Sequence, residues 1–390
     1  MAQNLVTGYS LLSYGGMVTN APRMEPYAKA LESLVTSESI VLDIGAGSGI
    51  FSLLACRFGA KAVVAIEPQS AIEIAKTTAQ ANGYLDRFTF YKGLSTDFKP
   101  EAQADIIVSD IRGVLPFFQS HISSIVDARE RLLKPSGCLI PRADTVMAAI
   151  VDAPDTFKKF ESPWISNEYG LDLSPGYKYV INSWIRVNLK EQDLLSLPQR
   201  FARLDYHKIL DPNVMNQLCL KAERDGTAHG FCLWFDSELT DSIGFSSAPG
   251  QPELIYGQAF FPFEDAISMQ KGDEIEISMK ANLIDNDYVY SWNWQVRSRD
   301  DKAAARSGRQ STFLSNLLTR SALERTSADH VPQLGAKAEI DLACLELVDG
   351  VNSMGEISKA VAARFPDHFG SWQEVLKHLS TLTERYRQTE

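Results

Sequence analysis

The sequence predicts an α/β protein in which a doubly wound parallel sheet is followed by a β-barrel domain and a small C-terminal helical module. Three changes of pattern support this fold class. Residues 38–142 alternate short apolar strands with helices, residues 143–300 contain short alternating or aromatic runs separated by turns, and residues 330–390 have helical spacing. Strand–helix alternation favours a parallel sheet with ligands at the carboxyl ends of its strands. Closely spaced short strands favour a barrel.

Composition restricts the location and the partners. The chain has 390 residues, 45% hydrophobic and 22% charged, which is ordinary for a globular protein with large cores. No apolar stretch reaches the roughly 18 residues of a membrane helix, and the N-terminus MAQNLVTGYS lacks the features of a signal peptide. We therefore expect a cytoplasmic protein without membrane contact. A net charge of -11 argues against a nucleic-acid partner held mainly by phosphate contacts.

The five cysteines do not indicate a metal site or a disulfide framework. They are scattered widely, with no C-x-x-C spacing and no histidine pair nearby. We expect buried free thiols and no bound metal. The cysteines are Cys56, Cys138, Cys219, Cys232 and Cys344.

Residues 1–36 precede the first strand and carry several bulky side chains. Met17, Asn20 and Arg23 are three residues apart, which places them near one face of a helix, and Tyr27 follows a further turn along. We expect a helical lid here. An arginine that faces a ligand loop is suited to a carboxylate, because its guanidinium donates two parallel hydrogen bonds.

A nucleotide-binding loop is expected in residues 41–55, VLDIGAGSGIFSLLA. An apolar strand leads into a turn with Gly45, Gly47 and Gly49, which let the backbone turn sharply and approach a ligand. The helix that follows directs its N-terminal amides toward the same place. Asp43 lies two residues before the first glycine, where its carboxylate can bind an ammonium or hydroxyl group directly or through water.

An acidic residue completes the expected adenosine site. Glu67 closes the next apolar run, AVVAIE, 22 residues after Gly45, a spacing at which a carboxylate reaches the ribose hydroxyls. Ile50 occupies the position of the third glycine in the dinucleotide fingerprint, which disfavours NAD. The combination resembles the class I S-adenosylmethionine-dependent methyltransferases. This resemblance implies S-adenosyl-L-methionine as the cofactor, with Arg23 on its methionyl carboxylate and Met17 among its contacts.

Two further strand ends contribute to the expected site. Leu94 and Ser95 follow the strand FTFYKG and are placed to flank the adenine, although a surface turn is an equal alternative. Ser109 and Asp110 end the strand ADIIVSD. Because these ends belong to one parallel sheet, we expect them near the glycine loop.

Turn residues set the remaining boundaries. A helix is expected from about residue 121 to 133, followed by a turn at 134–137 that leads into the next strand. The run KYVINSWIRVNL at 178–189 is expected to be a strand of the barrel. Three tryptophans are expected to pack inside the barrel rather than to bind ligand: Trp234, Trp292 and Trp294.

Residues 9 to about 297 resemble the protein arginine methyltransferase family. The shared features are a helical M-x-x-D-x-x-R-x-x-x-Y pattern, with Asn20 at the aspartate position, a VLD-x-G-x-G-x-G strand and loop, a substrate loop after the fourth strand, and a barrel behind. The resemblance implies methyl transfer to a guanidinium nitrogen. In that family a loop of approximately S-E-W-M-G-Y and a second glutamate nine residues after the first supply two carboxylates that clamp the guanidinium.

The substrate loop departs from this pattern. Residues 109–114 are S-D-I-R-G-V, with Asp110 at the first glutamate position and Gln119 at the second. We expect Asp110 to orient the acceptor and Gln119 to assist as a neutral hydrogen-bonding group; the alternative for Asp110 is a carboxylate that caps a turn. If the head of Arg112 faces the site, it repels a guanidinium and favours a carboxylate or phosphate instead; the alternative is that it points to solvent. The family's T-H-W loop has its equivalent at 254–257, LIYG, without a histidine.

The chain after the barrel divides into a linker and a helical module. Residues 301–329 begin with small and polar side chains, as is typical of a linker. Residues 330–390 contain helical stretches, with Ser353 as an expected N-cap and Glu356 as its capping-box partner. The string LVDGVNSMGEI resembles the winged-helix peptide-binding proteins of the pyrroloquinoline quinone pathway. The alternative is a cap or a dimer contact, so a homodimer is one expected assembly.

These expectations define five segments and a leading function. The segments are an N-terminal helical lid (1–36), a Rossmann-like S-adenosylmethionine-binding domain (37–142), a β-barrel substrate domain (143–300), a linker (301–329) and the helical module (330–390). We expect a methyltransferase that N-methylates an arginine-like guanidine or amine in a peptide, a protein or a small molecule. The alternatives are methylation of a small molecule or modified peptide natural product, and a catalytically weak cofactor-binding scaffold.

Overall fold

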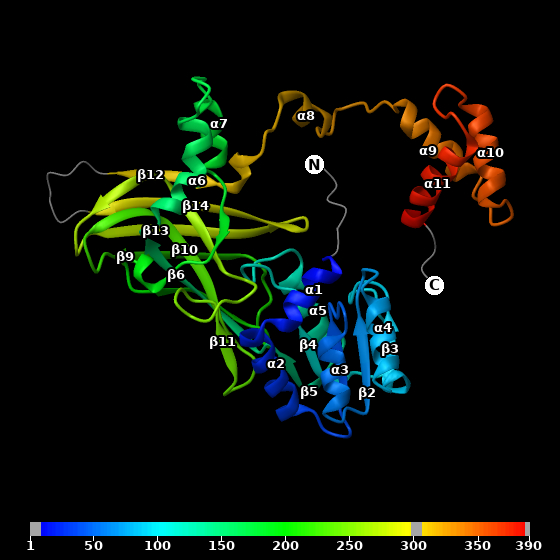
Figure 1. Ribbon diagram of the computed structural model, residues 1–390, viewed down its shortest axis with the longest axis horizontal. Helices are drawn as coiled ribbons and strands as arrows, with labels where there is room; N and C mark the ends of the chain where they lie inside the picture. Colours follow the sequence, from blue (N-terminus) through cyan, green and yellow to red (C-terminus); the bar gives the residue numbers. More distant parts are fainter. Residues whose placement is uncertain (1–8, 298–305, 387–390) are drawn as a thin grey trace. The chain divides into compact units, whose positions relative to one another are not determined.

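The computed structural model describes residues 9–297 and 306–386. Parts of the expected lid, linker and module lie outside this description, namely residues 1–8, 301–305 and 387–390. The chain forms two compact units, Met1–Leu317 and Leu318–Glu390. The first contains the parallel and antiparallel sheets, and the second contains helices, so each is described by itself (Figure 1).

The first unit begins with a five-stranded parallel sheet in the order β3-β2-β1-β4-β5. Its central strands are short apolar runs, and both of their faces are covered, as parallel sheets require. The expected doubly wound parallel sheet is therefore confirmed. The strands are β1 (Ile40–Ile44), β2 (Ala62–Ile66), β3 (Phe88–Tyr91), β4 (Ala104–Ser109) and β5 (Leu133–Ile140).

Helices cover this sheet and precede it. Tyr27 stacks on Phe51 with ring centroids 4.4 Å apart, which packs the second helix of the chain against the helix that follows the glycine loop. Pro22 lies in the first turn of that second helix, where a missing amide hydrogen costs nothing. The elements are α1 (Leu11–Thr19), α2 (Ala21–Leu34), α3 (Ile50–Arg57), α4 (Ile72–Ala81), η1 (Leu85–Arg87) and α5 (His121–Arg131).

The turn expected at 134–137 is not a separate connection. Helix α5 ends at Arg131, and β5 runs from Leu133 through these residues to Ile140. Leu133 pairs with Ala104 whereas Cys138 pairs with Ile106, so the ladder absorbs the extra residues as an irregularity of register. The prediction of a turn was wrong because a bulged strand and a turn use the same small and polar residues.

The antiparallel part of the first unit consists of two sheets. Six strands form one sheet, with β7-β12-β10-β6-β8 in order and β11 paired to β10; four form the other, in the order β15-β14-β13-β9. The strands are β6 (Ala143–Val151), β7 (Ile185–Val187), β8 (Gln199–Asp205), β9 (Val214–Lys221), β10 (Gly226–Glu238), β11 (Gly244–Ser246), β12 (Gln258–Met269), β13 (Glu274–Ile284), β14 (Asp287–Arg297) and β15 (Ser307–Ser311). The barrel expected from the sequence corresponds to these two sheets.

One hydrophobic core joins the parallel sheet to both antiparallel sheets. It includes Ile107 from β4, Phe231 from β10 and Trp292 from β14. Phe231 and Trp292 pack edge to face with centroids 6.4 Å apart. The three tryptophans of the expected barrel are buried, as predicted.

A helical insertion separates β6 from β7. It contains α6 (Pro154–Ile165) and α7 (Ser174–Val180), and η2 (Glu191–Asp193) follows β7. The expected strand at 178–189 is therefore only partly correct, because residues 178–180 end α7 and only Ile185–Val187 pair with β12. Phe157 and Phe160 of α6 pack onto the six-stranded sheet, and Tyr177 and Val180 of α7 pack against the same cluster. This packing holds residues 178–180 in a helix although their sequence alternates like a strand.

The second unit has a small core of its own. A short 3-10 helix, η3 (Thr312–Ser315), ends the first unit; α8 (Arg320–Arg325), α9 (Ala336–Glu346), α10 (Met354–Arg364) and α11 (Trp372–Tyr386) follow. Cys344, Val361 and Leu379 are buried among the last three helices. The capping box expected at Ser353 and Glu356 is present.

Two further observations concern the described residues as a whole. None of their helices is both long enough and apolar enough to span a membrane. The cysteines are free, but Cys219 is exposed and Cys138 is half-buried, so the prediction of buried thiols was wrong for these two. Cys219 lies on β9, which has sheet neighbours on one side, and its thiol donates to Oε2 of Glu274 at 3.4 Å.

Candidate functional site

The glycine loop turns from β1 into α3 at the carboxyl edge of the parallel sheet. The amides of Gly45 and Ala46 donate to the carbonyl oxygen of Ile66 at 2.9 and 3.0 Å, which ties the loop to β2. Gly47 has a φ of +53°, and a Cβ placed on it would lie 2.5 Å from the Tyr14 ring. Only glycine fits here without moving Tyr14, so the glycine lets α1 lie directly against the loop.

Glu67 follows β2 directly and is buried against the loop. Its Oε2 accepts from the amide of Gly47 at 2.9 Å, and its Oε1 accepts from the amide of Gln69 at 2.8 Å. Burial raises the pKa of Glu67, while these two hydrogen bonds oppose the rise. The carboxylate is therefore held in one orientation beside the loop, where it suits a ribose diol.

Asp43 is a buried carboxylate with one unused oxygen. Oδ2 accepts from the amide and hydroxyl of Ser52 at 3.0 and 2.7 Å, whereas Oδ1 has no hydrogen-bond partner. Burial raises the pKa of Asp43 to about 7. An orphaned buried acceptor is costly, so this atom fits a ligand that brings a hydrogen-bond donor. The loop and both carboxylates thus fit the polar end and ribose of S-adenosylmethionine.

Helix α1 covers the loop through Tyr14. Burial and the nearby charge of Glu67 raise the pKa of the Tyr14 phenol to about 12. Sequence reasoning noted Tyr14 only as a bulky side chain and did not assign it to the site. The available signal was Gly47, because a close approach of another element is one reason for a glycine in a loop.

The other expected cofactor contacts occupy different environments. Leu94 is 56% exposed, whereas Ser95 is buried and its carbonyl oxygen accepts from Arg131. The Ser109 hydroxyl donates to the carbonyl oxygen of Ile44 at 3.1 Å and so joins β4 to β1. Met17 is half-buried on α1. Their roles toward the cofactor stay predictions.

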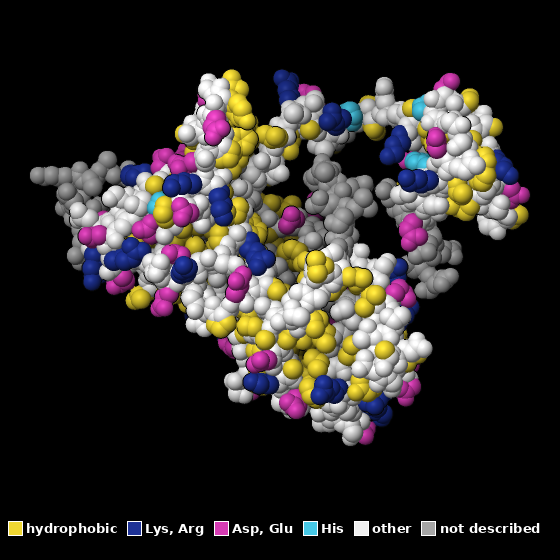
Figure 2. Space-filling model, viewed as in Figure 1, with side chains coloured by type: hydrophobic (Ala, Val, Ile, Leu, Met, Phe, Trp, Pro, Cys, Tyr) yellow, Lys and Arg dark blue, Asp and Glu magenta, His cyan; other side chains and the backbone are white. Residues whose placement is uncertain are grey.

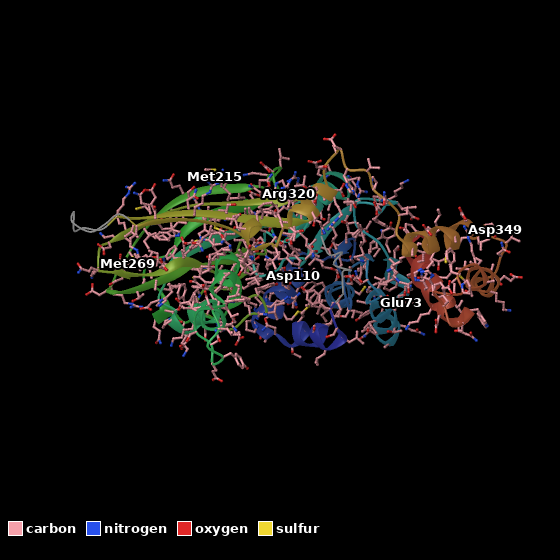
Figure 3. All side chains as sticks on the ribbon, turned by 90° about the horizontal axis from the view of Figure 1, so that it is seen from above. Glu73, Asp110, Met215, Met269, Arg320 and Asp349 are labelled. Atoms are coloured by element: carbon pink, nitrogen blue, oxygen red, sulfur yellow. The ribbon has the colours of Figure 1, made fainter. Side chains whose placement is uncertain are left out.

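Asp110, at the end of β4, is surrounded by cationic and phenolic donors. Oδ2 accepts from Nε of Arg23 at 2.6 Å and from the hydroxyl of Tyr256 at 2.5 Å. Oδ1 accepts from Nε and NH2 of Arg112 at 3.2 and 3.1 Å. Burial by itself would raise the pKa of Asp110, but the charges of Arg23 and Arg112 hold it below its usual range. Figure 3 labels Asp110 where the N-terminal helices meet the antiparallel part.

Arg112 points inward, so the solvent alternative was wrong. Its NH1 donates to Oδ1 of Asp144 at 2.7 Å and to the hydroxyl of Ser237 at 2.8 Å, and its NH2 donates to the hydroxyl of Tyr27 at 2.5 Å. Its side chain is fully buried. Three aromatic rings lie within cation–π distance of the guanidinium: Phe235 at 5.0 Å, Phe245 at 5.5 Å and Tyr256 at 5.7 Å.

The polar network continues to the start of α5. Tyr206 donates from its hydroxyl to Oδ2 of Asp144 at 2.6 Å, and Nε2 of His121 lies 3.0 Å from the same hydroxyl. Burial, helped by the positive charge of Arg112, lowers the pKa of His121 to about 3, so its ring is neutral. This network is built from the end of β4, the start of β6 and the end of β8, which lie far apart in the sequence.

The structure does not bring Gln119 to Asp110. Gln119 is exposed just before α5, with a φ of +44°, and the described contacts include no hydrogen bond between the two side chains. Its expected role as a helper stays a prediction. Tyr256, in the loop where the resembled family has its histidine, contacts Asp110 instead. Sequence reasoning missed Tyr256 and Asp144, and the loop position was the only signal for the first.

Two family models match consecutive parts of the chain. A model described as ribosomal protein L11 methyltransferase (PrmA) matches residues 27–164, and one described as the arginine methyltransferase oligomerization subdomain matches residues 142–299. The first match covers the parallel sheet and the second covers most of the antiparallel part. The predicted resemblance to methyltransferases of the arginine methyltransferase type is thereby confirmed.

The curated relatives described here are named protein arginine N-methyltransferases. The chain is 30% identical over 267 residues to protein arginine N-methyltransferase 8-B of Danio rerio, a match that covers 64% of this chain and 61% of that protein. It is 29% identical over 248 residues to protein arginine N-methyltransferase 1 of Saccharomyces cerevisiae, covering 61% and 71%. The chain thus spans 61% of the length of the Danio rerio protein and 59% of that of ribosomal protein arginine N-methyltransferase rmt3 of Schizosaccharomyces pombe, to which it is 28% identical.

Solved structures share the fold. An open-conformation structure of protein arginine methyltransferase 10 from Arabidopsis thaliana has a TM-score of 0.68 and 20% identity, covering 78% of this chain and 98% of that one. The Trypanosoma brucei PRMT1 enzyme-prozyme heterotetrameric complex with AdoHcy has a TM-score of 0.69 and 17% identity, covering 77% and 97%. At such identity the likeness establishes the fold alone.

Proposed function

We propose that this protein is an S-adenosylmethionine-dependent methyltransferase that transfers the methyl group to a nitrogen of a guanidine or amine acceptor. The observation that carries the proposal is the arrangement of Asp43, Glu67 and Gly47 around one loop, with Asp110 ending the neighbouring strand β4. The matched family models describe methyltransferases, and the named relatives are arginine N-methyltransferases, which supports the same reaction class here.

The residues of the loop divide the binding of the cofactor between them. We propose that Glu67, held by the amide of Gly47, accepts from the ribose hydroxyls, and that Oδ1 of Asp43 accepts from a polar donor of the cofactor. Arg23 is proposed for the methionyl carboxylate; in the structure its Nε and NH2 each lie 2.6 Å from Oδ2 of Asp110, so the two carboxylates would share this guanidinium. Tyr14 packs against the loop at Gly47 and is proposed to cover the bound cofactor. When bound, the sulfonium of the cofactor supplies an electrophilic methyl group.

Methyl transfer mainly requires alignment. The acceptor nitrogen attacks the methyl carbon with its lone pair, the carbon–sulfur bond breaks with its electrons left on sulfur, and the nitrogen then releases a proton to water. Holding the two partners in line removes much of the entropic barrier, so few acid-base groups are needed. We propose that Asp110, which directly follows β4 and stays ionised beside Arg23 and Arg112, stabilises the positive charge that develops on nitrogen.

A labelling experiment tests the reaction. The full chain is incubated with methyl-tritiated S-adenosylmethionine and a lysate, which is then separated into protein, peptide and metabolite fractions. We expect label in one fraction, together with an equal amount of S-adenosylhomocysteine. Tight cofactor binding in calorimetry without any transfer would instead support the scaffold alternative. Label in the metabolite or peptide fraction alone would support a small-molecule or modified-peptide acceptor.

Asp110→Asn tests the acceptor side. Asparagine keeps the shape but removes the charge that stabilises the nitrogen, so we expect turnover to fall at least about a hundredfold while the dissociation constant of the cofactor changes less than about threefold. Turnover is followed as S-adenosylhomocysteine formation, and thermal unfolding checks that the variant folds. Asp155→Asn is the control, because that side chain is 98% exposed on α6. Equal turnover in the two variants would make Asp110 structural only.

Assembly is proposed from the helical insertion. Figure 2 shows hydrophobic side chains gathered along α6 and α7, and Ile165, Tyr169 and Leu171 are 55%, 83% and 63% exposed. An apolar surface of this kind favours a protein contact, and the matched oligomerization subdomain includes it. A homodimer and a cytoplasmic location stay predictions.

A further inference from the structure

Arg112 already has every hydrogen bond that a guanidinium can make. A guanidinium has five N–H donors, and in Arg112 they reach Asp110, Asp144, Ser237 and Tyr27, with Asp110 receiving two. Aromatic rings lie beside it as well. These surroundings, two carboxylates and an aromatic wall, are what a protein needs to bind an arginine side chain. In this protein the side chain of Arg112 itself occupies that arginine-binding environment.

The charges of this buried group are balanced. Arg23 and Arg112 contribute two positive charges, and Asp110 and Asp144 contribute two negative charges. Tyr27, Tyr206, Tyr256 and His121 face the group as neutral side chains, because burial shifts each of their pKa values toward the neutral form. A second guanidinium would bring an uncompensated charge into a site with little water to solvate it.

We propose that Arg112 is a specificity-determining residue that saturates the acceptor carboxylate as a resident guanidinium, so that the acceptor nitrogen enters uncharged. This proposal rests on the proposed function and narrows it from guanidines and amines to nitrogens that are neutral when bound. The loop pattern of the resembled family has a methionine at this position, so the resident charge is a property of this chain.

The free energy needed to deprotonate the acceptor nitrogen differs between alkyl amines, guanidines and aromatic amines. At about pH 7.5 an alkyl amine with a pKa of about 10.4 is neutral in roughly one molecule per thousand, whereas a guanidine with a pKa near 13.8 is neutral in roughly one per million. An aromatic amine is already neutral at this pH. Asp110 is a poor base for removing the extra proton, because both of its oxygens are occupied and its pKa is held low by Arg23 and Arg112.

The test removes the positive charge of Arg112 together with the negative charge of Asp144. Arg112→Met with Asp144→Asn replaces a buried ion pair by neutral groups of similar size, which avoids leaving Asp144 charged and unpaired. Three blocked peptides that differ at one position serve as probes: arginine, lysine and 4-aminophenylalanine. Binding to the full chain in the presence of S-adenosylhomocysteine is read by fluorescence anisotropy, and transfer is read as S-adenosylhomocysteine formed from the cofactor.

The wild-type protein should transfer to 4-aminophenylalanine faster than to lysine, and to arginine least. In the double variant the arginine peptide should bind at least about tenfold more tightly, because Oδ1 of Asp110 loses the two hydrogen bonds from Arg112 and is free to accept from the peptide, while Arg23 still balances the charge of Asp110. Arg203→Met with Glu238→Gln is the matched control, since that ion pair joins β8 to β10 at the surface. The control should leave the affinity order unchanged.

The outcomes separate this proposal from the proposed function. Arginine affinity that is equal in the double variant and the wild type, with both folded, would overturn the resident-guanidinium assignment, and so would a wild-type protein that prefers arginine. Absence of transfer to any probe would count against the proposed reaction, while the anisotropy measurement would still decide the specificity. Tighter binding of the arginine peptide to the double variant supports the assignment of Arg112 as a resident guanidinium, whether or not methyl transfer is detected.

Discussion

Two buried carboxylates set the chemistry of the loop at the residue scale. Asp43 and Glu67 both lie at the carboxyl edge of the parallel sheet. Both carboxylate oxygens of Glu67 accept from backbone amides, whereas one oxygen of Asp43 has no hydrogen-bond partner among the described residues. A fixed carboxylate serves a diol that needs one orientation, whereas a free acceptor attracts a donor from the ligand. These residues therefore have different roles despite similar burial.

Glu67→Gln is expected to weaken cofactor binding at least about tenfold, because an amide replaces a charged acceptor beside the ribose site. Isothermal calorimetry with S-adenosylmethionine or S-adenosylhomocysteine gives the dissociation constant. Glu73→Gln is the matched control: this residue is labelled in Figure 3 and lies on the exposed side of α4, where it pairs only with Lys76. Unchanged affinity in Glu67→Gln would remove this residue from the cofactor site.

At the scale of elements, α5 is joined to the chain just after β8 by a neutral histidine and by Arg129, which donates to the carbonyl oxygen of Tyr206 at 3.0 Å. His121 begins α5, its Nε2 lies 3.0 Å from the hydroxyl of Tyr206, and its Nδ1 has no partner among the described residues. Protonation of the ring would place a charge beside Arg112 in a buried site. Burial of His121 against Tyr206 is therefore favourable only while the ring is neutral.

This contact predicts a pH dependence of stability. Burial lowers the pKa of His121 from 6.5 to about 3, so between these values the unfolded chain binds a proton that the folded chain does not. The contribution is complete above pH 6.5 and is lost as the pH falls toward 3, by about 1.4 kcal/mol per pH unit. In urea unfolding, His121→Gln should show a smaller loss of stability over this range than the wild type. His330→Gln, at an exposed position, should follow the wild type; identical slopes for all three proteins would contradict the prediction.

At the scale of the whole molecule, the division after Leu317 separates two cores. The cofactor loop and the polar network lie in the first unit, and the second unit has its own apolar cluster. Units with separate cores unfold and refold with partial independence. The residues assigned to the cofactor all lie in the first unit, and a peptide-binding role for the second unit stays a prediction.

Truncation after Leu317 tests this division. We expect the shortened chain to bind S-adenosylhomocysteine within about twofold of the full chain, since no assigned cofactor residue is removed. Calorimetric unfolding should lose one transition and keep the other. If the helical module binds a peptide, affinity for that peptide should fall while cofactor affinity stays. A large loss of cofactor affinity would show instead that the two units act together.

The sequence alone determined the fold class, the glycine loop and the strand ends that carry Asp43, Glu67 and Asp110, because spacing and local residue types encode these features. It could not determine what Asp110 pairs with. Arg23 lies 87 residues away in the chain, and Tyr256 lies 146 residues away. Whether the guanidinium of Arg112 points to solvent or into the interior depends on the packing of distant strands, which no local pattern records. Only the tertiary structure decided that Arg112 points inward, where Asp144 on β6 and the aromatic wall balance and enclose its charge.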